Sequence, residues 1–517
     1  MSVVRVVAGL QAARTLPATR LIIAGQRRHN DLRPRFGATP IDESAWRRAL
    51  RSISEPGDCS VLLNDAKLLL LPDSSKASRV NTPTQAVELS KLLRSAAASM
   101  QKTKEGDEAE RLSVLLFCSR PHAAALVAAV TRCFSTYSRK SDQNVVPQVD
   151  VEVVVQDGEP LNEKDVDALS TLANAIQKAA FLVDQPANEL TTDAFVQVAK
   201  EWIQELSIPN VAVRQIRGEE LREQGFGGIY NVGKAGPQPP SLLVFSINGD
   251  LKSDKSVALV GKGVVFDTGG MQLKPPTGML TMKHDMGGAA AVLGAFGVLA
   301  RSGFPDPLHL VLCIVENNIS PAANKPDDVI RLLSGRTVEI NNTDAEGRLI
   351  LADGVCFARR DLAANLVVDV ATLTGAQAYA TGRTHAAVLA NGDGIERRAL
   401  SAGRRSGELV HALPFAPELH FGDLKSEIAD MKNTIAAGKN QGPPSAVAGL
   451  FIGKQINFGQ ADAKKSDVDW TCDWLHVDMA SLVAVNERAT GFGVGLLCSL
   501  LGDRCAAAGT TVWTGDI

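Results

Sequence analysis

Residues 260–290 read VGKGVVFDTGGMQLKPPTGMLTMKHDMGGAA, and residues 341–349 read NNTDAEGRL. Both stretches set charged residues beside glycines in an otherwise apolar half of the chain. Seven of these charged residues stand out: Lys262, Asp267, Lys274, Asp285, Asp344, Glu346 and Arg348. Burying charge costs free energy unless the charges are paired or bind metal, so this combination indicates a functional site.

Apolar runs alternate with helical patterns around these stretches. The expected strands are SLLVFSI (241–247), SVALVG (256–261), HLVLCIV (309–315) and NLVVDVATL (365–373), with helices at 286–301 and 345–360. Such apolar runs are typical of a mostly parallel sheet covered by helices on both faces. Ligands bind outside the carboxyl ends of the strands in these sheets, and both charged stretches follow expected strands.

The N-terminal portion shows a second α/β pattern without a cluster of reactive side chains. Its expected strands are LIIAG (21–25), SVLLN (60–64), LSVLLFC (112–118) and VDVEVVV (149–155), with helices at 84–100 and 121–133. An amphipathic helix from about Asn162 to Val183 follows and should end before Pro186. We therefore predict an α/β protein with a smaller N-terminal domain, 1–183, of structural or assembly role, and a catalytic domain, 184–517.

Composition excludes several classes of protein. A net charge of −3 gives no electrostatic case for binding nucleic acid. No apolar run reaches the roughly 18 residues of a membrane-spanning helix. The eight cysteines contain no C-x-x-C pair, which favours buried thiols in a reducing compartment.

The first 28 residues leave the compartment open. Five arginines precede the first acidic residue, Asp31, as in a mitochondrial presequence: Arg5, Arg14, Arg20, Arg27 and Arg28. The favoured alternative is that LIIAG is the first strand of a domain, preceded by a short arm. A cytoplasmic location is therefore expected, with mitochondria as the alternative.

The residue types of the two stretches suit a pair of divalent cations. Carboxylates bind hard or borderline cations, and two such ions can hold a carbonyl and activate a hydroxide. Lys262 could bind metal only when neutral, and burial beside a cation lowers the pKa of a lysine. Lys274 would stay protonated and polarise a substrate carbonyl, and Arg348 could hold an oxyanion such as bicarbonate. A phosphate loop is excluded because GKGVVFDTGG lacks the required spacing.

Each residue taken alone also has a structural interpretation. Asp285 could cap a helix starting near Met286, and Asp344 and Glu346 could lie in a helix first turn. The joint pattern favours a site.

The joint pattern resembles the M17 leucyl aminopeptidase family. The resemblance rests on NTDAEGRL, on K-x-x-x-x-D-[ST]-G-G-x-x-x-K from Lys262 to Lys274, and on DMGGAA from Asp285. It spans roughly residues 183–502 and includes VDQPANELTTDAF, DVATLTGAQ, SEIADMKN and WLHVDMA. The chain looks closest to the probable aminopeptidase-like 1 branch and to the acidic leucyl aminopeptidases of kinetoplastids.

The resemblance implies a role for each of the seven residues. Asp267 and Glu346 would bridge two metal ions, Asp344 would complete the exchangeable site, and Lys262 and Asp285 the tighter one. Lys274 and Arg348 would be catalytic, with bicarbonate on Arg348 as general base. The metals would be Zn, Mn or Co, or else Mg, and the family assembles as homohexamers.

Four further residues are expected to form the substrate pocket. Met282, Thr372, Leu373 and Gly375 should line it, although ordinary packing explains Leu373 nearly as well. The chain departs from many relatives at Leu280, Thr281 and His284, and Ser481-Leu482 stands where Gly-Pro is frequent. These departures leave the side-chain preference open.

The sequence thus predicts a metal-dependent exopeptidase that releases leucine or other apolar N-terminal residues from peptides by hydroxide attack on the scissile carbonyl. One rival is a narrow dipeptidase, for example for Cys-Gly. A second rival is a hexameric scaffold that binds DNA, against which the near-neutral charge argues.

Overall fold

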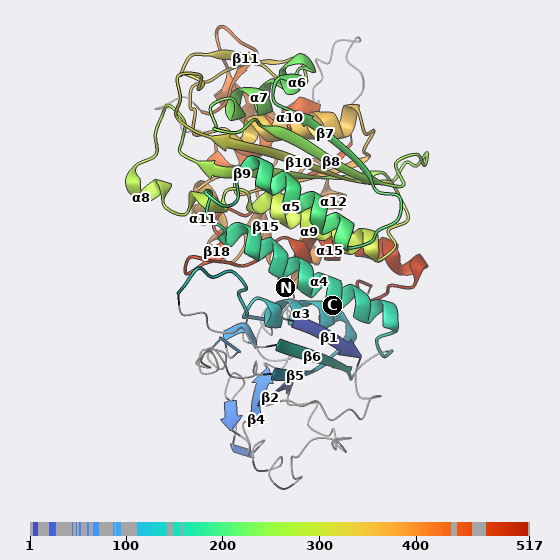
Figure 1. Cartoon of the computed structure of the whole chain (residues 1–517). Helices are drawn as coiled ribbons and strands as arrows, with labels where there is room; N and C mark the ends of the chain where they lie inside the picture. The colour runs from blue at the N-terminus through green and yellow to red at the C-terminus, as the bar shows by residue number, and fades with distance from the viewer. Residues whose placement is uncertain are drawn as a thin grey trace.

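The computed structural model of the chain describes most of residues 111–514 and shorter pieces before them. Between residues 4 and 94 it describes four strands and scattered helical positions. Within the larger part the gaps are 142–147, 157–158, 436–441 and 457–471. Two sheets, one above the other in Figure 1, organise the described residues.

The N-terminal sheet has six strands in the order β1-β6-β5-β2-β4-β3, and only β3 with β4 is antiparallel. Its strands are β1 Val4–Ala8, β2 Arg20–Gln26, β3 Cys59–Val61, β4 Ala66–Leu71, β5 Arg111–Cys118 and β6 Gln148–Val155. The four expected strands are confirmed, with residues 60 and 61 of SVLLN in β3 and residues 62–64 outside the described part of the chain. The expected N-terminal arm was wrong for residues 4–8, because β1 pairs with β6 at the sheet edge.

The expected linking helix is α4, Glu163–Asp184. Asn162 caps it reciprocally with Asp165: the Asn162 side chain accepts from the Asp165 N–H, and the Asp165 carboxylate accepts from the Asn162 N–H. The helix lies between the two sheets and packs against β1 on one side and the long helix α9, Gly287–Arg301, on the other (Figure 1).

The second sheet has eight strands in the order β15-β14-β17-β13-β9-β10-β8-β7. These are β7 Ala212–Arg217, β8 Ser241–Ile247, β9 Val257–Asp267, β10 Leu308–Asn317, β13 Leu366–Ala371, β14 Ala386–Ala390, β15 Val410–Ala412 and β17 Asp473–Asp478. The central strands are parallel, and β7, β8 and β14 join neighbours in antiparallel pairs. The predicted mostly parallel sheet is confirmed.

Strand β9 is longer than SVALVG predicted, so Lys262 lies inside the strand rather than just after it. The apolar side chains of VVF continue the strand, and Gly261 lets helix α9 come close: a Cβ there would lie 2.5 Å from the Ala289 Cα. Asp267 is the last residue of the strand.

Side chains of β9 alternate between two cores. Val257 and Leu259 join the core that includes α4 and α9, whereas Ala258 and Val260 join the core under α10, Gly347–Arg360. Figure 1 shows α5 and α9 on the face toward α4, and α7 and α10 on the opposite face. The sheet is therefore covered on both faces, as expected.

The remaining elements belong to the second unit, the part of the chain from about residue 184 onward that contains the eight-stranded sheet; the first unit contains the six-stranded sheet. Its helices are α5 Thr192–Glu205, α6 Glu219–Glu223, α7 Gly227–Gly233, α8 Pro276–Met279, α11 Ala376–Thr381, α12 Asp393–Ser406, α13 Pro417–His420, α14 Pro444–Gly453 and α15 Val494–Leu501. Short strands β11 Val329–Arg331, β12 Thr337–Glu339 and β16 Met431–Lys432 form a small sheet, and β18 Ala484–Val485 pairs with β19 Arg488–Ala489. Among the described residues, no helix is long and apolar enough to cross a membrane.

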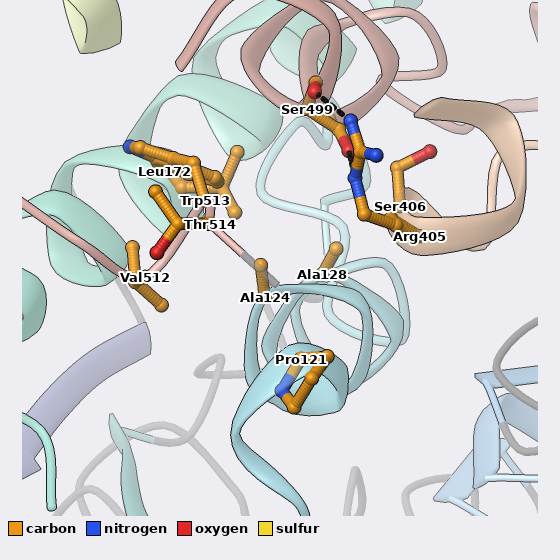
Figure 2. A pocket seen from close by; sticks show the side chains of 11 residues that line it. Pro121, Ala124, Ala128, Leu172, Arg405, Ser406, Ser499, Val512, Trp513 and Thr514 are labelled. Atoms are coloured by element: carbon orange, nitrogen blue, oxygen red, sulfur yellow. Dashed lines mark hydrogen bonds between the residues drawn. The ribbon is translucent and has the colours of Figure 1, made fainter. Parts of the chain in front are cut away.

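Helix α3, Ala123–Thr131, contributes to the junction between the two units in Figure 2. Ala124 and Ala128 lie on its surface, near the C-terminal residues Val512 and Trp513. On the far side, the Arg405 guanidinium donates to the Ser499 hydroxyl and carbonyl at 3.2 and 2.7 Å.

Two buried carboxylates tie the units together. Asp165 pairs with Arg120 and accepts from the N–H groups of Thr511 and Val512. Glu408 pairs with Arg132 and accepts from N–H groups around the start of α15. A carboxylate at a helix N-terminus is favoured by the helix dipole.

The buried His309 makes the stability of the fold depend on pH. His309 on β10 has its Nδ1 2.8 Å from the Ser246 hydroxyl on β8, and burial lowers its pKa to about 4. The unfolded chain, with a pKa of about 6.5, therefore binds a proton that the folded protein does not. Stability from this group is present above pH about 6.5 and is lost as the pH falls toward about 4.

We expect His309→Asn to reduce that pH dependence, because an amide can keep the bond to Ser246 without titrating. The measurement compares thermal midpoints of both proteins between about pH 7 and about pH 5, where the variant should lose less. Parallel profiles would contradict the buried, neutral histidine.

Candidate metal centre and active site

The structure brings the seven sequence-predicted residues into one cluster. Strand β9 supplies Lys262 and Asp267, and the loop after it supplies Lys274. Asp285 lies between the short helix η3, Met282–His284, and α9. The turn before α10 supplies Asp344 and Glu346, and the first turn of α10 supplies Arg348.

Lys262 is the buried centre of the first half of the cluster. Its Nζ lies 2.7 Å from the Asp285 Oδ1 and 2.9 Å from the Glu346 Oε1, and it donates to the Thr372 carbonyl at 3.0 Å. Its side chain is only 3% exposed. An ammonium in such a place depends on its carboxylate partners.

Lys274 makes the matching contacts in the second half. Its Nζ lies 2.8 Å from the Asp267 Oδ2 and 2.6 Å from the Asp344 Oδ1. This lysine is more open than Lys262, with 15% of its side chain exposed. It is therefore placed to meet a ligand that enters from solvent.

Arg348 is buried beside Glu346. One terminal nitrogen donates to the Asn433 carbonyl at 2.9 Å, while its buried Nε has no hydrogen-bond partner. Burial lowers the pKa of this guanidinium to about 10, although Glu346 and Asp478 act in the opposite direction. A buried donor without a partner fits a residue that holds an oxyanion.

The carboxylates fit a metal centre. Asp267, Asp344 and Glu346 each offer one oxygen, and these three atoms lie within 4.8 Å of one another. The Asp285 Oδ2 and Glu346 Oε2 are buried and lack hydrogen-bond partners. Unpaired buried carboxylate oxygens are costly unless a cation binds them. A set of carboxylate oxygens together with one lysine amine suits several divalent ions.

Electrostatics show how tightly the charges depend on one another. Burial raises the pKa values of Asp285 and Glu346, and neighbouring carboxylates raise them further. Burial alone would lower the pKa of Lys262, but Asp285, Glu346 and Asp267 together raise it. Among these carboxylates the lysine therefore stays protonated, and a cation must take over its role before it can become a ligand.

The structural interpretations of single residues do not hold. The N-cap of α9 is Met286 rather than Asp285, and it makes no side-chain cap. Glu346 occupies the N-cap position of α10, but its carboxylate goes to Lys262 instead of capping. The first turn of α10 contains no acidic residue.

Neutral residues that the sequence did not single out orient the candidate ligands. The Asn317 amide donates to the Asp267 Oδ1 at 2.8 Å and to the Thr343 carbonyl. The Gln272 side chain accepts from the Thr343 N–H, and the Thr343 hydroxyl accepts from the Gln272 N–H. Gly269 holds a φ of 87° between these groups, which favours glycine. Only contacts across the fold reveal such residues.

The four predicted pocket residues differ in their surroundings. Thr372 is buried, and its hydroxyl donates to the Asp285 Oδ1 at 2.8 Å. Leu373 is half-buried against the core under α10, and Gly375 is open. Met282 is half-buried in η3, three residues before Asp285.

Comparison with known proteins agrees with this geometry. The sequence model of the Cytosol aminopeptidase family, catalytic domain, matches residues 177–498. This chain belongs to the M17 aminopeptidase family. It is 46% identical to Leucine aminopeptidase 1 of Caenorhabditis elegans over 463 residues, 89% of this chain and 88% of that protein. It is 42% identical to Probable aminopeptidase NPEPL1 of Homo sapiens over 470 residues, 89% and 84% of the two chains.

Solved M17 structures share the whole fold. The structure of the Caenorhabditis elegans leucine aminopeptidase superposes with a TM-score of 0.88 at 43% identity, covering 99% of this chain and 100% of that chain. The Trypanosoma brucei leucyl aminopeptidase in complex with bestatin gives 0.83 at 32% identity, covering 97% and 96%. The resemblance indicated by the motifs is thereby confirmed, and the chain is a hydrolase of the leucine aminopeptidase family.

The Thr372 hydroxyl yields a prediction for metal binding. Thr372→Val keeps the shape but removes the bond that orients Asp285, so affinity for Mn²⁺ should fall about tenfold. Isothermal titration of metal-free protein would measure it. Thr510→Val, which removes another buried hydroxyl bond, to the Ser302 carbonyl, should bind as wild type. Unchanged affinity in Thr372→Val would remove Thr372 from the site.

Proposed function

We propose that this M17 protein is a metal-dependent leucyl aminopeptidase that releases leucine or other apolar residues from peptide N-termini. One observation carries the proposal: two lysines reach four carboxylates in one buried cluster. Two divalent cations, Zn, Mn, Co or Mg, would be held by five of its residues: Lys262, Asp267, Asp285, Asp344 and Glu346. When bound, such ions polarise a carbonyl and make water nucleophilic at neutral pH.

The other charged residues would act on the substrate. Lys274, the more exposed lysine, would donate to the oxygen of the scissile carbonyl as negative charge develops there. Arg348 would hold bicarbonate, whose oxygen accepts the proton of the attacking water and passes it to the leaving amine. The unpartnered Arg348 Nε supports this role.

The preference for an apolar N-terminal residue would come from a substrate pocket next to Lys262 and Lys274. Met282, Thr372, Leu373 and Gly375 would form the pocket for the first side chain. The Thr372 hydroxyl is bonded to Asp285 and its carbonyl to Lys262, so the pocket wall and the ligands would be held as one unit.

The remaining proposals concern organisation. Residues 1–183 would serve assembly and 184–517 catalysis, in a cytoplasmic homohexamer acting on short peptides. Sedimentation of the purified protein tests the assembly: a mass near six chains supports it, and a monomer would contradict it.

The first experiment is hydrolysis of Leu-p-nitroanilide and Leu-amide before and after chelation, with Mn, Co or Zn added back. Activity that disappears with the metal and returns with it supports the proposal and ranks the metals. Faster turnover of Cys-Gly than of Leu-amide would instead favour a narrow dipeptidase.

Lys274→Ala and Glu346→Ala should each lower kcat by at least about a thousandfold, because one removes a donor to the developing oxyanion and the other a metal ligand. Steady-state kinetics on Leu-amide would measure this. Lys252→Ala and Glu427→Ala change exposed side chains and serve as charge-matched controls. Full activity in both active-site variants, with metal content intact, would rule out the scheme.

A further inference from the structure

Asn433 is a neutral, fully buried residue next to the metal centre to which the proposed chemistry gives no task. It follows β16, which pairs in parallel with β12 through Val338 with Met431 and Glu339 with Lys432. The Asn433 N–H continues this ladder by donating to the Glu339 carbonyl at 3.2 Å. Past that bond β12 gives way to the loop that carries Asp344.

Beyond the end of β12, the side-chain amide of Asn433 forms hydrogen bonds with the backbone groups that a neighbouring strand would otherwise pair with. Its Oδ1 accepts from the N–H groups of Asn341 at 3.0 Å and Asn342 at 3.2 Å. Its Nδ2 donates to the carbonyls of Asn342 at 2.6 Å and Ala345 at 3.3 Å. A primary amide has two acceptor lone pairs and two donor hydrogens, so its whole capacity is spent on this loop.

These bonds enclose the metal-ligating turn. Asp344 lies between the bonded residues Asn342 and Ala345, and Glu346 follows directly. The Asn433 backbone carbonyl also accepts from Arg348 at 2.9 Å. One residue is thus bonded to the loop before, within and after the two ligands.

We propose that Asn433 is a positioning residue whose side-chain amide fixes the Asn341–Ala345 loop so that Asp344 and Glu346 meet at one metal centre. This inference rests on the proposed function for its kinetic consequence but not for its consequence for metal binding. Without the amide, the N–H groups of Asn341 and Asn342 and the Ala345 carbonyl lose this partner, and the Asn342 carbonyl keeps only its bond from the Ala345 N–H. The half-buried loop then relaxes away from the geometry that joins the ligands.

Two substitutions separate shape from hydrogen bonding. Asn433→Ala removes the amide, and Asn433→Asp keeps its size but turns oxygen toward the carbonyls of Asn342 and Ala345. Neither changes the backbone carbonyl that holds Arg348. The effect should therefore appear in the metal ligands rather than in Arg348.

Gln455 provides a matched control for loss of a buried amide. It is fully buried in the same core, donates to the Phe451 carbonyl at 3.0 Å and to the Met431 sulfur of β16 at 3.5 Å, and accepts from the Ser334 hydroxyl at 2.7 Å. These bonds do not reach the Asn341–Ala345 loop. Gln455→Ala should lower the thermal midpoint without changing the metal centre.

The test titrates metal-free wild type, Asn433→Ala, Asn433→Asp and Gln455→Ala with Mn²⁺, and records thermal midpoints and, on Leu-amide, kcat and KM. Both Asn433 variants should bind Mn²⁺ about 10- to 100-fold more weakly. Their kcat measured at a fixed subsaturating Mn²⁺ concentration should fall with occupancy, while KM changes less than about threefold. Gln455→Ala should match wild type in Mn²⁺ affinity and kcat.

Wild-type Mn²⁺ affinity in a folded Asn433 variant would overturn the proposal, as would an equal loss of affinity in Gln455→Ala. Where Asn433→Ala does not fold, the isosteric Asn433→Asp decides by the same two outcomes. A wild-type protein that binds Mn²⁺ but hydrolyses no peptide would refute the aminopeptidase function alone, because the binding isotherms still test Asn433.

Discussion

The contact of the Lys262 ammonium with Asp285 and Glu346 is the constraint on which the rest of the catalytic unit depends. A lysine in the middle of a central strand requires carboxylates within reach and backbone that leaves it room. A Cβ on Gly347 would lie 2.6 Å from the lysine Cε, so the turn into α10 needs glycine there. Gly261, on the preceding position of β9, lets α9 approach closely enough to bring Asp285 to the same ammonium.

The charges of the cluster nearly balance among themselves. Three cationic side chains, Lys262, Lys274 and Arg348, face four carboxylates. Each lysine bridges two carboxylates, as a cation between them would. Divalent ions that replaced the lysine contacts would free Lys262 to become neutral and would leave positive charge to be met by an anion, which is the role suggested for bicarbonate on Arg348.

The charged part of the site was predictable from the sequence, because ionisable residues so close to apolar strands are costly to bury without partners or metal. Asn317 and Asn433 were not, since they are neutral and only tertiary pairing decides which loop each amide meets. The same limit applies to the strands. The long apolar run of β10 was predictable, whereas the expected strand SVALVG ended at Gly261, where β9 continues to Asp267. Glycine there serves close helix packing rather than a bend, a distinction that a single sequence does not contain.

Helix α4 ends at the predicted domain boundary and is bonded there to residues of the second domain. At the end of this helix, the Asp184 carboxylate accepts from the Ala489 N–H at 2.9 Å and pairs with Arg488. The Asp184 backbone carbonyl accepts a hydrogen bond from the Lys283 ammonium. Lys283 stands two residues before Asp285, so the linking helix holds the loop that carries a predicted metal ligand. The family match beginning at residue 177, inside α4, is consistent with this contact. The helix that joins the two sheets is therefore part of the frame around the candidate metal centre.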